Sequence, residues 1–210
     1  MTVVLDTTLR EGELQPGVYY TREARLAIGQ ALAEVGTPRI EFPIVYPSRG
    51  GRLEEVKDAI TMIQQNYSKS IPVIHARAYR KDVELANSYD AEGCAIFMAA
   101  TALHRKDKFH GIGQDEIIER FVSNLEFMKD CGFNYRRATV EDASRFFIAE
   151  ERSDEDSLVF LRQLLLAIQD AGATIISIPD TSGILAPNQC LPFINTICEI
   201  VDIPVACHFH

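Results

Sequence analysis

Two patterns of hydrophobic and polar residues alternate along the chain. Short runs rich in β-branched residues predict strands, and they read TVVLDTT, RIEFPIV, IPVIHARA, GCAIFMAA, YRRATVE, TIISIPDT and IPVACHFH. Between these runs, residues 22–35, 115–131 and 154–171 carry apolar residues at the spacing of amphipathic helices. In the second of these segments, Ile117 and Phe121 begin an apolar face. Alternating strands and helices predict a parallel sheet covered by helices.

Glycines mark the ends of three predicted helices. Gly36, Gly132 and Gly172 stand where a helix ends just before a strand, in EVGTPRIEF, DCGFNYRRA and DAGATIISI. This is the position at which a helix needs a left-handed cap. The recurrence indicates one strand–helix unit used several times. Because no linker or low-complexity tract divides the chain, we expect one domain over residues 1–210.

An open doubly wound sheet and an eight-stranded barrel both fit this order of elements. No GxGxxG or GxxxxGK sequence follows the first strand, so nothing supports a nucleotide-binding open sheet. Polar residues instead recur near the carboxyl ends of the strands, where barrel enzymes carry their chemistry. They are Asp6, Arg10, Glu11, Glu41, His75, Arg77, Thr101, Glu141, Thr181, His208 and His210. We therefore expect an α/β (β/α)8 TIM barrel that is present through its seventh strand and incomplete at its C-terminus.

Bulk properties exclude several classes of function. The composition is that of a globular protein, with 47% hydrophobic and 24% charged residues. A net charge of -9 disfavours a nucleic-acid-binding face. No apolar run is long enough to predict a membrane span. The five cysteines include no CxxC pair, which predicts reduced thiols and a cytoplasmic protein.

The HFH sequence predicts a pair of metal ligands. His208 and His210 stand two residues apart, so both imidazoles lie on one face of the last strand. A short histidine pair alone is more often incidental. Together with a carboxylate from the first strand, it gives a two-histidine, one-carboxylate set that leaves coordination positions open for a substrate. Such a set would suit Mg, Mn, Zn or Co.

Arginines accompany these ligands. RRATVED places Arg137, Thr139 and Glu141 on one face of the fifth strand, and HAR places His75 and Arg77 on one face of the third. Most arginines are solvated surface charges. At the mouth of a barrel beside a metal, however, they favour a polyanionic acid, because the guanidinium fork matches a carboxylate.

Four motifs in order carry a family resemblance. DTTLREGE, EDASR, PDTSG and HFH resemble the metal-dependent barrel lyases and acyl-CoA condensing enzymes. This family includes 2-isopropylmalate, citramalate and homocitrate synthases and 3-hydroxy-3-methylglutaryl-CoA lyase. The resemblance covers the entire chain and is strongest to the homocitrate synthases. Arg10–Glu11, His75 two residues before Arg77, and Arg137 four residues before the glutamate of strand five carry this preference.

The resemblance implies a role for each candidate residue. Glu11, His208 and His210 would hold a divalent metal. Arg10 would stabilise negative charge on the keto oxygen or enolate, and Asp6 would be its partner. Glu141 and Thr181 would orient substrate or a proton-transferring group. The residues expected to bind substrate are Asp6, Glu41, His75, Arg77, Arg137 and Thr139.

The implied reaction joins acetyl-CoA to a 2-oxo acid such as 2-oxoglutarate, and thioester hydrolysis then releases CoA. The resemblance therefore implies an acyltransferase of amino-acid biosynthesis with two small-molecule substrates. Members of the family are commonly homodimers. The alternatives are a 2-isopropylmalate or citramalate synthase, a lyase of the same family, and an inactive truncated barrel. Leu14 stands where the family usually has Gln, and Ala95 stands where the homocitrate branch has Asp.

Overall fold

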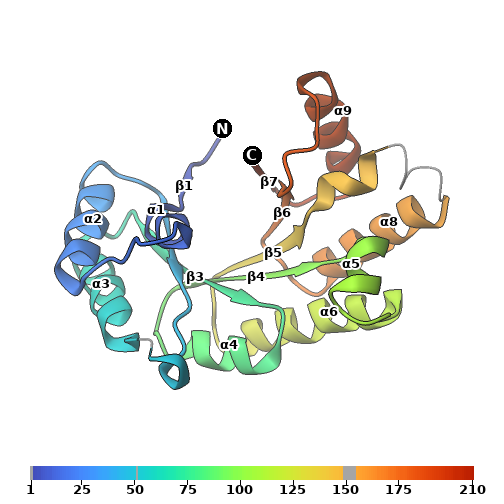
Figure 1. Ribbon diagram of the computed structural model, residues 1–210. Helices are drawn as coiled ribbons and strands as arrows, with labels where there is room; N and C mark the ends of the chain where they lie inside the picture. The colour runs from blue at the N-terminus through green and yellow to red at the C-terminus, as the bar shows by residue number, and fades with distance from the viewer. Residues whose placement is uncertain (1, 51, 149–154) are drawn as a thin grey trace. The chain divides into compact units, whose positions relative to one another are not determined.

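The computed structural model describes residues 2–50, 52–148 and 155–210. Their strands form one sheet in the chain order β1 to β7. The pairs β1–β2, β2–β3, β5–β6 and β6–β7 are all parallel, and helices alternate with the strands along the chain (Figure 1). Parallel strands in sequential order, joined by helices, have the topology of a (β/α)8 barrel. The predicted fold class is confirmed as a partial TIM barrel.

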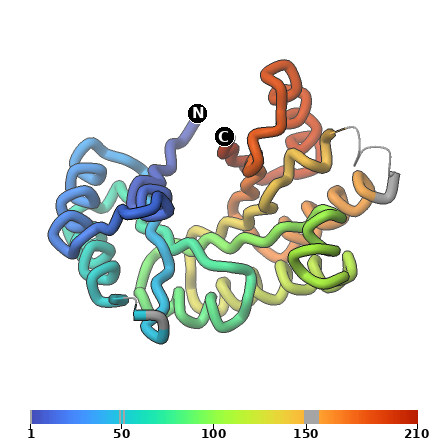
Figure 2. The backbone as a smooth tube through the Cα atoms, in the orientation of Figure 1, coloured from blue at the N-terminus to red at the C-terminus, as the bar shows by residue number. Residues whose placement is uncertain are grey.

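The described chain forms two compact units. The first comprises residues 1–95 and 131–135, and the second comprises residues 96–130 and 136–210. The boundary falls within β4, Gly93–Ala99. Figure 2 follows the backbone through both units by residue number.

The first unit contains β1 to β3 and the helices that follow them. Its elements are β1 Leu5–Asp6, α1 Thr8–Glu11, η1 Gly12–Leu14, α2 Arg22–Glu34, β2 Arg39–Pro43, η2 Pro47–Arg49, α3 Leu53–Asn66, β3 Ile71–Arg77 and α4 Arg80–Asn87. Ile40 of β2 and Ile74 of β3 are fully buried on one face of the sheet, and α3 buries an apolar face that includes Val56 and Ile60.

The second unit contains the remainder of β4 and the strands β5 to β7. Its elements are α5 Ala102–Asp107, α6 Gln114–Asp130, β5 Tyr135–Glu141, η3 Ala143–Phe147, α8 Glu155–Asp170, β6 Ile175–Asp180, α9 Pro187–Cys198 and β7 Val205–Phe209. The helices expected at 115–131 and 154–171 are confirmed, although residue 154 lies outside the described residues. Ile117 and Phe121 are fully buried, as their spacing predicts.

The predicted left-handed caps are confirmed. Gly36, Gly132 and Gly172 have φ values of 80°, 85° and 93°. These angles strain any residue that carries a Cβ atom. A glycine at each helix end therefore lets the chain turn directly into the next strand.

The first strand is shorter than its hydrophobic pattern predicts. The pattern runs over TVVLDTT, but only Leu5 and Asp6 form β1. The backbone N–H of Thr8 donates to Asp6 Oδ1 at 2.9 Å, and α1 begins at Thr8. The aspartate thus ends the strand by satisfying a donor at the helix start.

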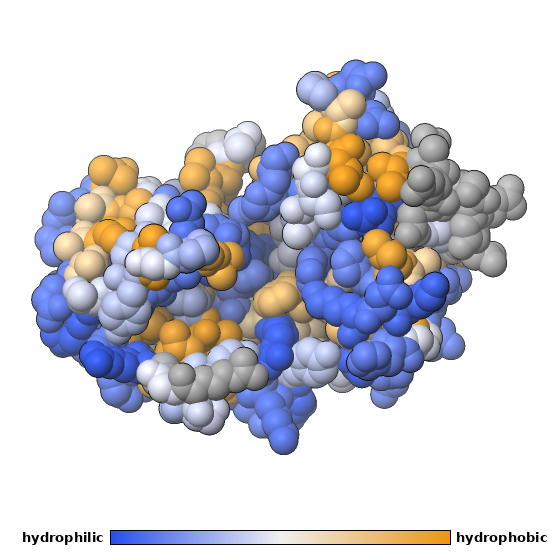
Figure 3. All heavy atoms as spheres, viewed as in Figure 1, coloured by the Kyte–Doolittle hydropathy of each residue, from blue (hydrophilic) through white to orange (hydrophobic). Residues whose placement is uncertain are grey.

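The surface and the thiols fit a globular protein. The visible face in Figure 3 is mostly hydrophilic, with hydrophobic residues in smaller groups. All five cysteines are free thiols, as predicted. Among the described residues, no helix has the length and apolar character needed to cross a bilayer.

Candidate functional site

Arg10 is held between two carboxylates at the end of β1. Its Nε donates to Glu41 Oε2 at 2.5 Å, and its Nη2 lies 2.6 Å from Glu11 Oε1. The Glu41 side chain is completely buried on β2, while that of Arg10 is 16% exposed. A buried carboxylate with a charge-assisted hydrogen bond fixes the guanidinium strongly. Arg10 is thereby oriented at the carboxyl end of the strand.

The partner of Arg10 differs from the one predicted. Asp6 was expected to hold Arg10, and Glu41 was expected to bind substrate. The register between β1 and β2 explains why Glu41, and not Asp6, is the partner of Arg10. Asp6 pairs with Ile40, so its side chain lies on the opposite face of the sheet from that of Glu41. Asp6 is also occupied as the acceptor for the Thr8 N–H. Glu41 therefore orients Arg10.

His75 and Arg77 lie on one face of β3, as predicted from their spacing. Arg77 donates to Asp82, from Nε at 2.6 Å and from Nη2 at 3.1 Å. Tyr46 also donates its hydroxyl to Asp82, at 2.8 Å. The Arg77 guanidinium lies 5.4 Å from the ring centroids of both Tyr46 and Tyr79.

The carboxylate of Asp82 and the aromatic rings of Tyr46 and Tyr79 stabilise the positive charge of Arg77. The hydrogen bond that Arg77 donates to Asp82 raises the pKa of Arg77 above its ordinary value. Burial, followed by the bond to Asp82, raises the pKa of the Tyr46 phenol. Sequence reasoning missed Asp82 and Tyr46, because neither belongs to a motif and both meet Arg77 only through the fold.

The predicted row on β5 forms. Arg137 and Thr139 are buried, with exposures of 5% and 8%. Thr139 is in register with Ser177 of β6, and both side chains lie on the same face. Thr139 Oγ1 is buried and finds no hydrogen-bond partner within the described part of the chain. Because buried hydroxyls are normally satisfied, this atom is a candidate for contact with a ligand.

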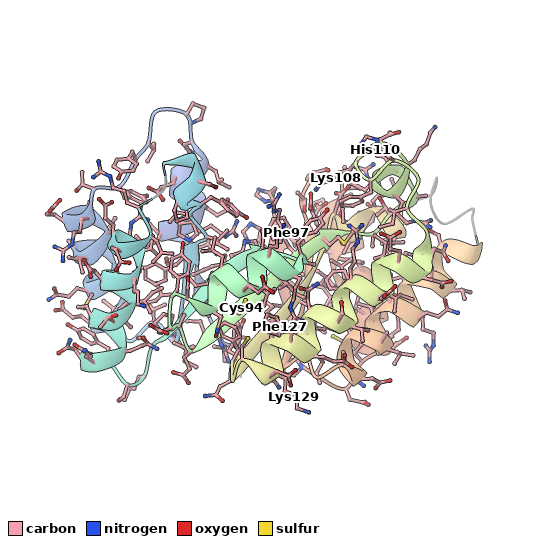
Figure 4. All side chains as sticks on the ribbon, turned by 90° about the horizontal axis from the view of Figure 1, so that it is seen from below. Cys94, Phe97, Lys108, His110, Phe127 and Lys129 are labelled. Carbon is pink, nitrogen blue, oxygen red and sulfur yellow. The ribbon has the colours of Figure 1, made fainter. Side chains whose placement is uncertain are left out.

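Glu141 ends the same row and is engaged by a lysine. Lys108 Nζ donates to Glu141 Oε1 at 2.7 Å and to Oε2 at 2.8 Å. Figure 4 labels Lys108 on the segment between α5 and α6. Sequence reasoning missed this residue, since only the fold brings it to β5.

Asp142 joins the loops that follow β5 and β6. Its backbone N–H donates to Thr181 Oγ1 at 3.0 Å, and its Oδ1 accepts from Ser182 Oγ at 2.9 Å. Arg145 Nε donates to its other oxygen at 2.6 Å. Asp142 is 1% exposed and has a positive φ of 57°. The EDASR and PDTSG motifs are therefore one hydrogen-bonded assembly that positions Thr181.

Asp180 orders the turn beside the histidines. It accepts from Ser144 Oγ at 2.6 Å and from the backbone N–H groups of Ile184 and Leu185 at 3.0 and 3.1 Å. Burial raises the pKa of Asp180, but these hydrogen bonds outweigh burial and the net pKa is lowered. Asp180 is thus held as a carboxylate at the end of β6.

His208 and His210 lie together on one face at the end of β7. Their ring centroids are 4.8 Å apart and the rings are tilted by 52°. His208 is in register with Pro179 of β6. A Cβ atom on Gly183 would come within 3.2 Å of the backbone oxygen of His210, so the PDTSG turn packs closely on the HFH end.

The predicted site residues divide between the two units. The first unit holds Asp6, Arg10, Glu11, Glu41, His75 and Arg77. The second holds Arg137, Thr139, Glu141, Thr181, His208 and His210. Among the described residues, no three or more His, Cys, Asp or Glu side chains form a group that could hold a metal. The predicted ligand set combines Glu11 of one unit with the two histidines of the other.

Comparison with known proteins assigns a relationship over the whole chain. The model of the HMGL-like family matches residues 2–210. The homocitrate synthase AksA of Methanopyrus kandleri is 33% identical over 99% of this chain and 48% of its own length. The homocitrate synthase of Sulfolobus acidocaldarius is 32% identical over 99% of this chain and 42% of its own length. The chain spans less than half the length of these relatives.

Solved structures show the same fold. The HMG-CoA lyase of Bacillus subtilis has a TM-score of 0.76 at 18% identity, covering 99% of this chain and 68% of that chain. The carboxyl transferase domain of Rhizobium etli pyruvate carboxylase has a TM-score of 0.71 at 15% identity, covering 99% and 35%.

Proposed function

Because the chain belongs to the HMGL-like family, we propose that it carries the metal- and 2-oxo-acid-binding part of an enzyme that condenses acetyl-CoA with a 2-oxo acid. Two relatives at 33% and 32% identity are named homocitrate synthases. The observation that carries the proposal is the buried row of Arg137 and Thr139 leading to Glu141 on β5. It offers a cation and an unsatisfied hydroxyl for a dianionic acid such as 2-oxoglutarate.

We propose the metal ligands from the chemistry of the residue types. His208 and His210 present neighbouring imidazoles on one face of β7, and Glu11 adds a carboxylate at the end of β1. Two imidazoles and one carboxylate leave positions open for an oxygen-rich substrate. We propose that these three residues hold Mg, Mn, Zn or Co. A bound metal ion would supply Lewis-acid polarisation of the 2-oxo acid carbonyl.

The remaining residues would bind and orient the reactants. Arg10, fixed by Glu41, would stabilise the negative charge that develops on the keto oxygen when the acetyl-CoA enolate attacks. Arg137 would bind the distal carboxylate of the acid. Glu141 and Thr181 would orient substrate and the group that moves a proton. His75 lies on the β3 face predicted to complete the recess.

Arg77 has a different task in this proposal. Since Asp82 already meets its guanidinium with two hydrogen bonds, Arg77 ties β3 to α4. We assign the selective contact with a second carboxylate to Arg137, which shares a strand face with Thr139 and Glu141. A homodimer and a cytoplasmic location remain predictions from the sequence.

The test is substrate binding with and without metal. Titration calorimetry of the purified protein with 2-oxoglutarate, before and after addition of Mg²⁺ or Mn²⁺, should give binding that depends on the metal. A second assay follows CoA release from acetyl-CoA with 2-oxoglutarate, pyruvate or 2-oxoisovalerate. Metal-independent binding of 2-oxoglutarate, or no binding of it with metal present, would contradict the proposal. Preference for pyruvate or 2-oxoisovalerate would favour a citramalate or 2-isopropylmalate synthase.

A further inference from the structure

A lysine from another part of the second unit forms an ion pair with Glu141. Lys108 Nζ reaches both carboxylate oxygens, at 2.7 and 2.8 Å. Lys108 directly follows α5, and its side chain is 44% exposed, whereas that of Glu141 is 21% exposed. The ammonium also lies 5.7 Å from the ring centroid of Phe109. A cation attracted to an aromatic face samples fewer positions.

The same helix makes a second contact with the end of β5. His104 and Lys108 are four residues apart and therefore lie on one side of the α5 segment. His104 Nδ1 lies 2.8 Å from Thr101 Oγ1, which caps α5, and 3.9 Å from Asp142 Oδ2. One side of α5 thus meets two consecutive acidic residues, Glu141 and Asp142.

The ion pair contributes little to stability. Partly exposed pairs are worth about 0–1 kcal/mol because water and salt screen them. The consequence of the Lys108 contact is local: both oxygens of a carboxylate at a strand end are fixed in one orientation. Arg137 and Thr139 precede Glu141 on the same strand face. A substrate bound along that face would therefore contact the Glu141 carboxylate in the orientation that Lys108 fixes.

We propose that Lys108 is a positioning residue for the condensation, which holds the Glu141 carboxylate in the orientation that the reaction requires. The inference rests on the proposed function, because that function gives Glu141 its task. Lys108 acts through Glu141 and makes no contact with the reacting atoms. Misplacement of a catalytic group by about 1 Å costs up to about 100-fold in rate.

Three variants test the proposal. Lys108→Met removes the charge and keeps the length of the side chain, and it should lower kcat about tenfold to a hundredfold. The KM for 2-oxoglutarate and its calorimetric affinity should change by less than about twofold, since the acid is held elsewhere. Lys108→Arg restores a cation that can reach both oxygens, and it should recover most of kcat. Lys57→Met is the matched control. Lys57 forms an ion pair with Asp90, with an Nζ–Oδ2 distance of 2.6 Å, and neither residue belongs to the candidate site.

Thermal unfolding separates positioning from folding. Lys108→Met should shift the unfolding midpoint by less than about 4 °C, as should Lys57→Met. If wild-type protein turns over substrate and Lys108→Met has the same kcat, the positioning role is wrong while the proposed function stands. A loss that Lys108→Arg does not recover, or one accompanied by a large fall in stability, also overturns it. If the wild-type protein neither binds 2-oxoglutarate nor releases CoA, the proposed function itself fails.

Discussion

Arg136 and Arg137 are neighbours on β5 whose side chains lie on opposite faces of the sheet. Arg136 Nε donates to the backbone oxygen of Gly172 at 2.8 Å, whereas Arg137 shares the face of Thr139 and Glu141. Two arginines of equal charge therefore have different surroundings one residue apart. This makes Arg136 the natural control for the predicted role of Arg137.

Arg137→Ala should weaken the use of 2-oxoglutarate much more than that of pyruvate or 2-oxoisovalerate. A charge-assisted contact with a carboxylate is worth about 1.5–3 kcal/mol, or roughly tenfold to a hundredfold in specificity. The measurement is kcat/KM for the three acids in wild type, Arg137→Ala and Arg136→Ala. Arg136→Ala should leave the ratio between the acids unchanged. An equal loss for all three acids in Arg137→Ala would make this arginine structural.

Asp180 should make stability depend on pH. Its folded pKa lies below the unfolded value, since hydrogen bonds from Ser144, Ile184 and Leu185 outweigh burial. The resulting stabilisation is present above the unfolded pKa, about 3.9, and is lost as the pH falls through the folded pKa. Asp180→Asn should lower the free energy of unfolding at pH 7 by about 1–3 kcal/mol.

Urea unfolding across pH 2–7 checks this assignment. The wild-type midpoint should fall steeply below about pH 4, and the Asp180→Asn midpoint should fall less. Ser177→Ala, on the same strand but outside this hydrogen-bond group, is the control and should keep the wild-type slope. Parallel pH dependences for wild type and Asp180→Asn would place the acid sensitivity in other carboxylates.

Alternation along a strand determined which residue predictions succeeded. Arg137, Thr139 and Glu141 share a face because side chains two residues apart always do. The partner of Arg10 could not be obtained in this way. It depends on the β1–β2 register, which pairs Asp6 with Ile40, and on the hydrogen bond that Asp6 accepts from the Thr8 N–H. A single sequence specifies neither of these long-range facts.

At the scale of elements, a buried ion pair ties the segment after α1 to α2. Arg25 of α2 is 2% exposed, and it donates to both oxygens of Glu13 at 3.0 and 2.9 Å. Glu13 Oε1 also accepts from the Tyr20 backbone N–H. The turn is tight, because a Cβ atom on Gly12 would lie 2.0 Å from the Tyr20 hydroxyl. These contacts hold in place the segment that follows Arg10 along the chain.

Removing one member of this pair should be costly. Arg25→Met leaves the Glu13 carboxylate without its cation, and it should lower the free energy of unfolding by about 3–5 kcal/mol. The double variant Glu13→Gln, Arg25→Met should lose less, because no unpaired charge remains. Arg22→Met is the control. Its pair with Asp58 is half exposed and should cost less than about 1 kcal/mol.

Chemical denaturation of the four proteins measures these differences. Equal destabilisation by Arg25→Met and Arg22→Met would show that burial does not strengthen the Glu13–Arg25 pair. A double variant as unstable as Arg25→Met would mean that lost packing, and not the unpaired charge, sets the cost.

Long periodic segments were the elements best predicted from sequence. The helix at 115–131 and the glycine-terminated helix ends were recovered because packing periodicity and left-handed caps are local properties. The short α1 and η1 were missed. They follow a run with strand composition, and Asp6 accepts a hydrogen bond from the Thr8 N–H where α1 begins.

At the scale of the whole molecule, the sequential strand order was predictable, whereas the division into two compact units was not. Hydrophobic patterning indicates which faces are buried but not how densely neighbouring elements contact one another, and the boundary falls inside a continuous apolar strand. Of the residues predicted to bind metal, Glu11 belongs to the first unit and His208 and His210 belong to the second.

The proposed ligand assignment predicts that metal binding needs residues from both ends of the chain. Glu11→Gln and His208→Ala should each lower metal affinity at least about tenfold, since even residues that merely support a ligand contribute that much. Metal analysis and calorimetric titration with Mn²⁺ or Zn²⁺ measure the effect. His110→Asn is the control. His110 is exposed and has a φ of 57°, and asparagine readily adopts such a positive φ. Loss in His208→Ala with normal binding in Glu11→Gln would confine the site to the second unit. Wild-type metal content in both variants would remove the ligand assignment altogether.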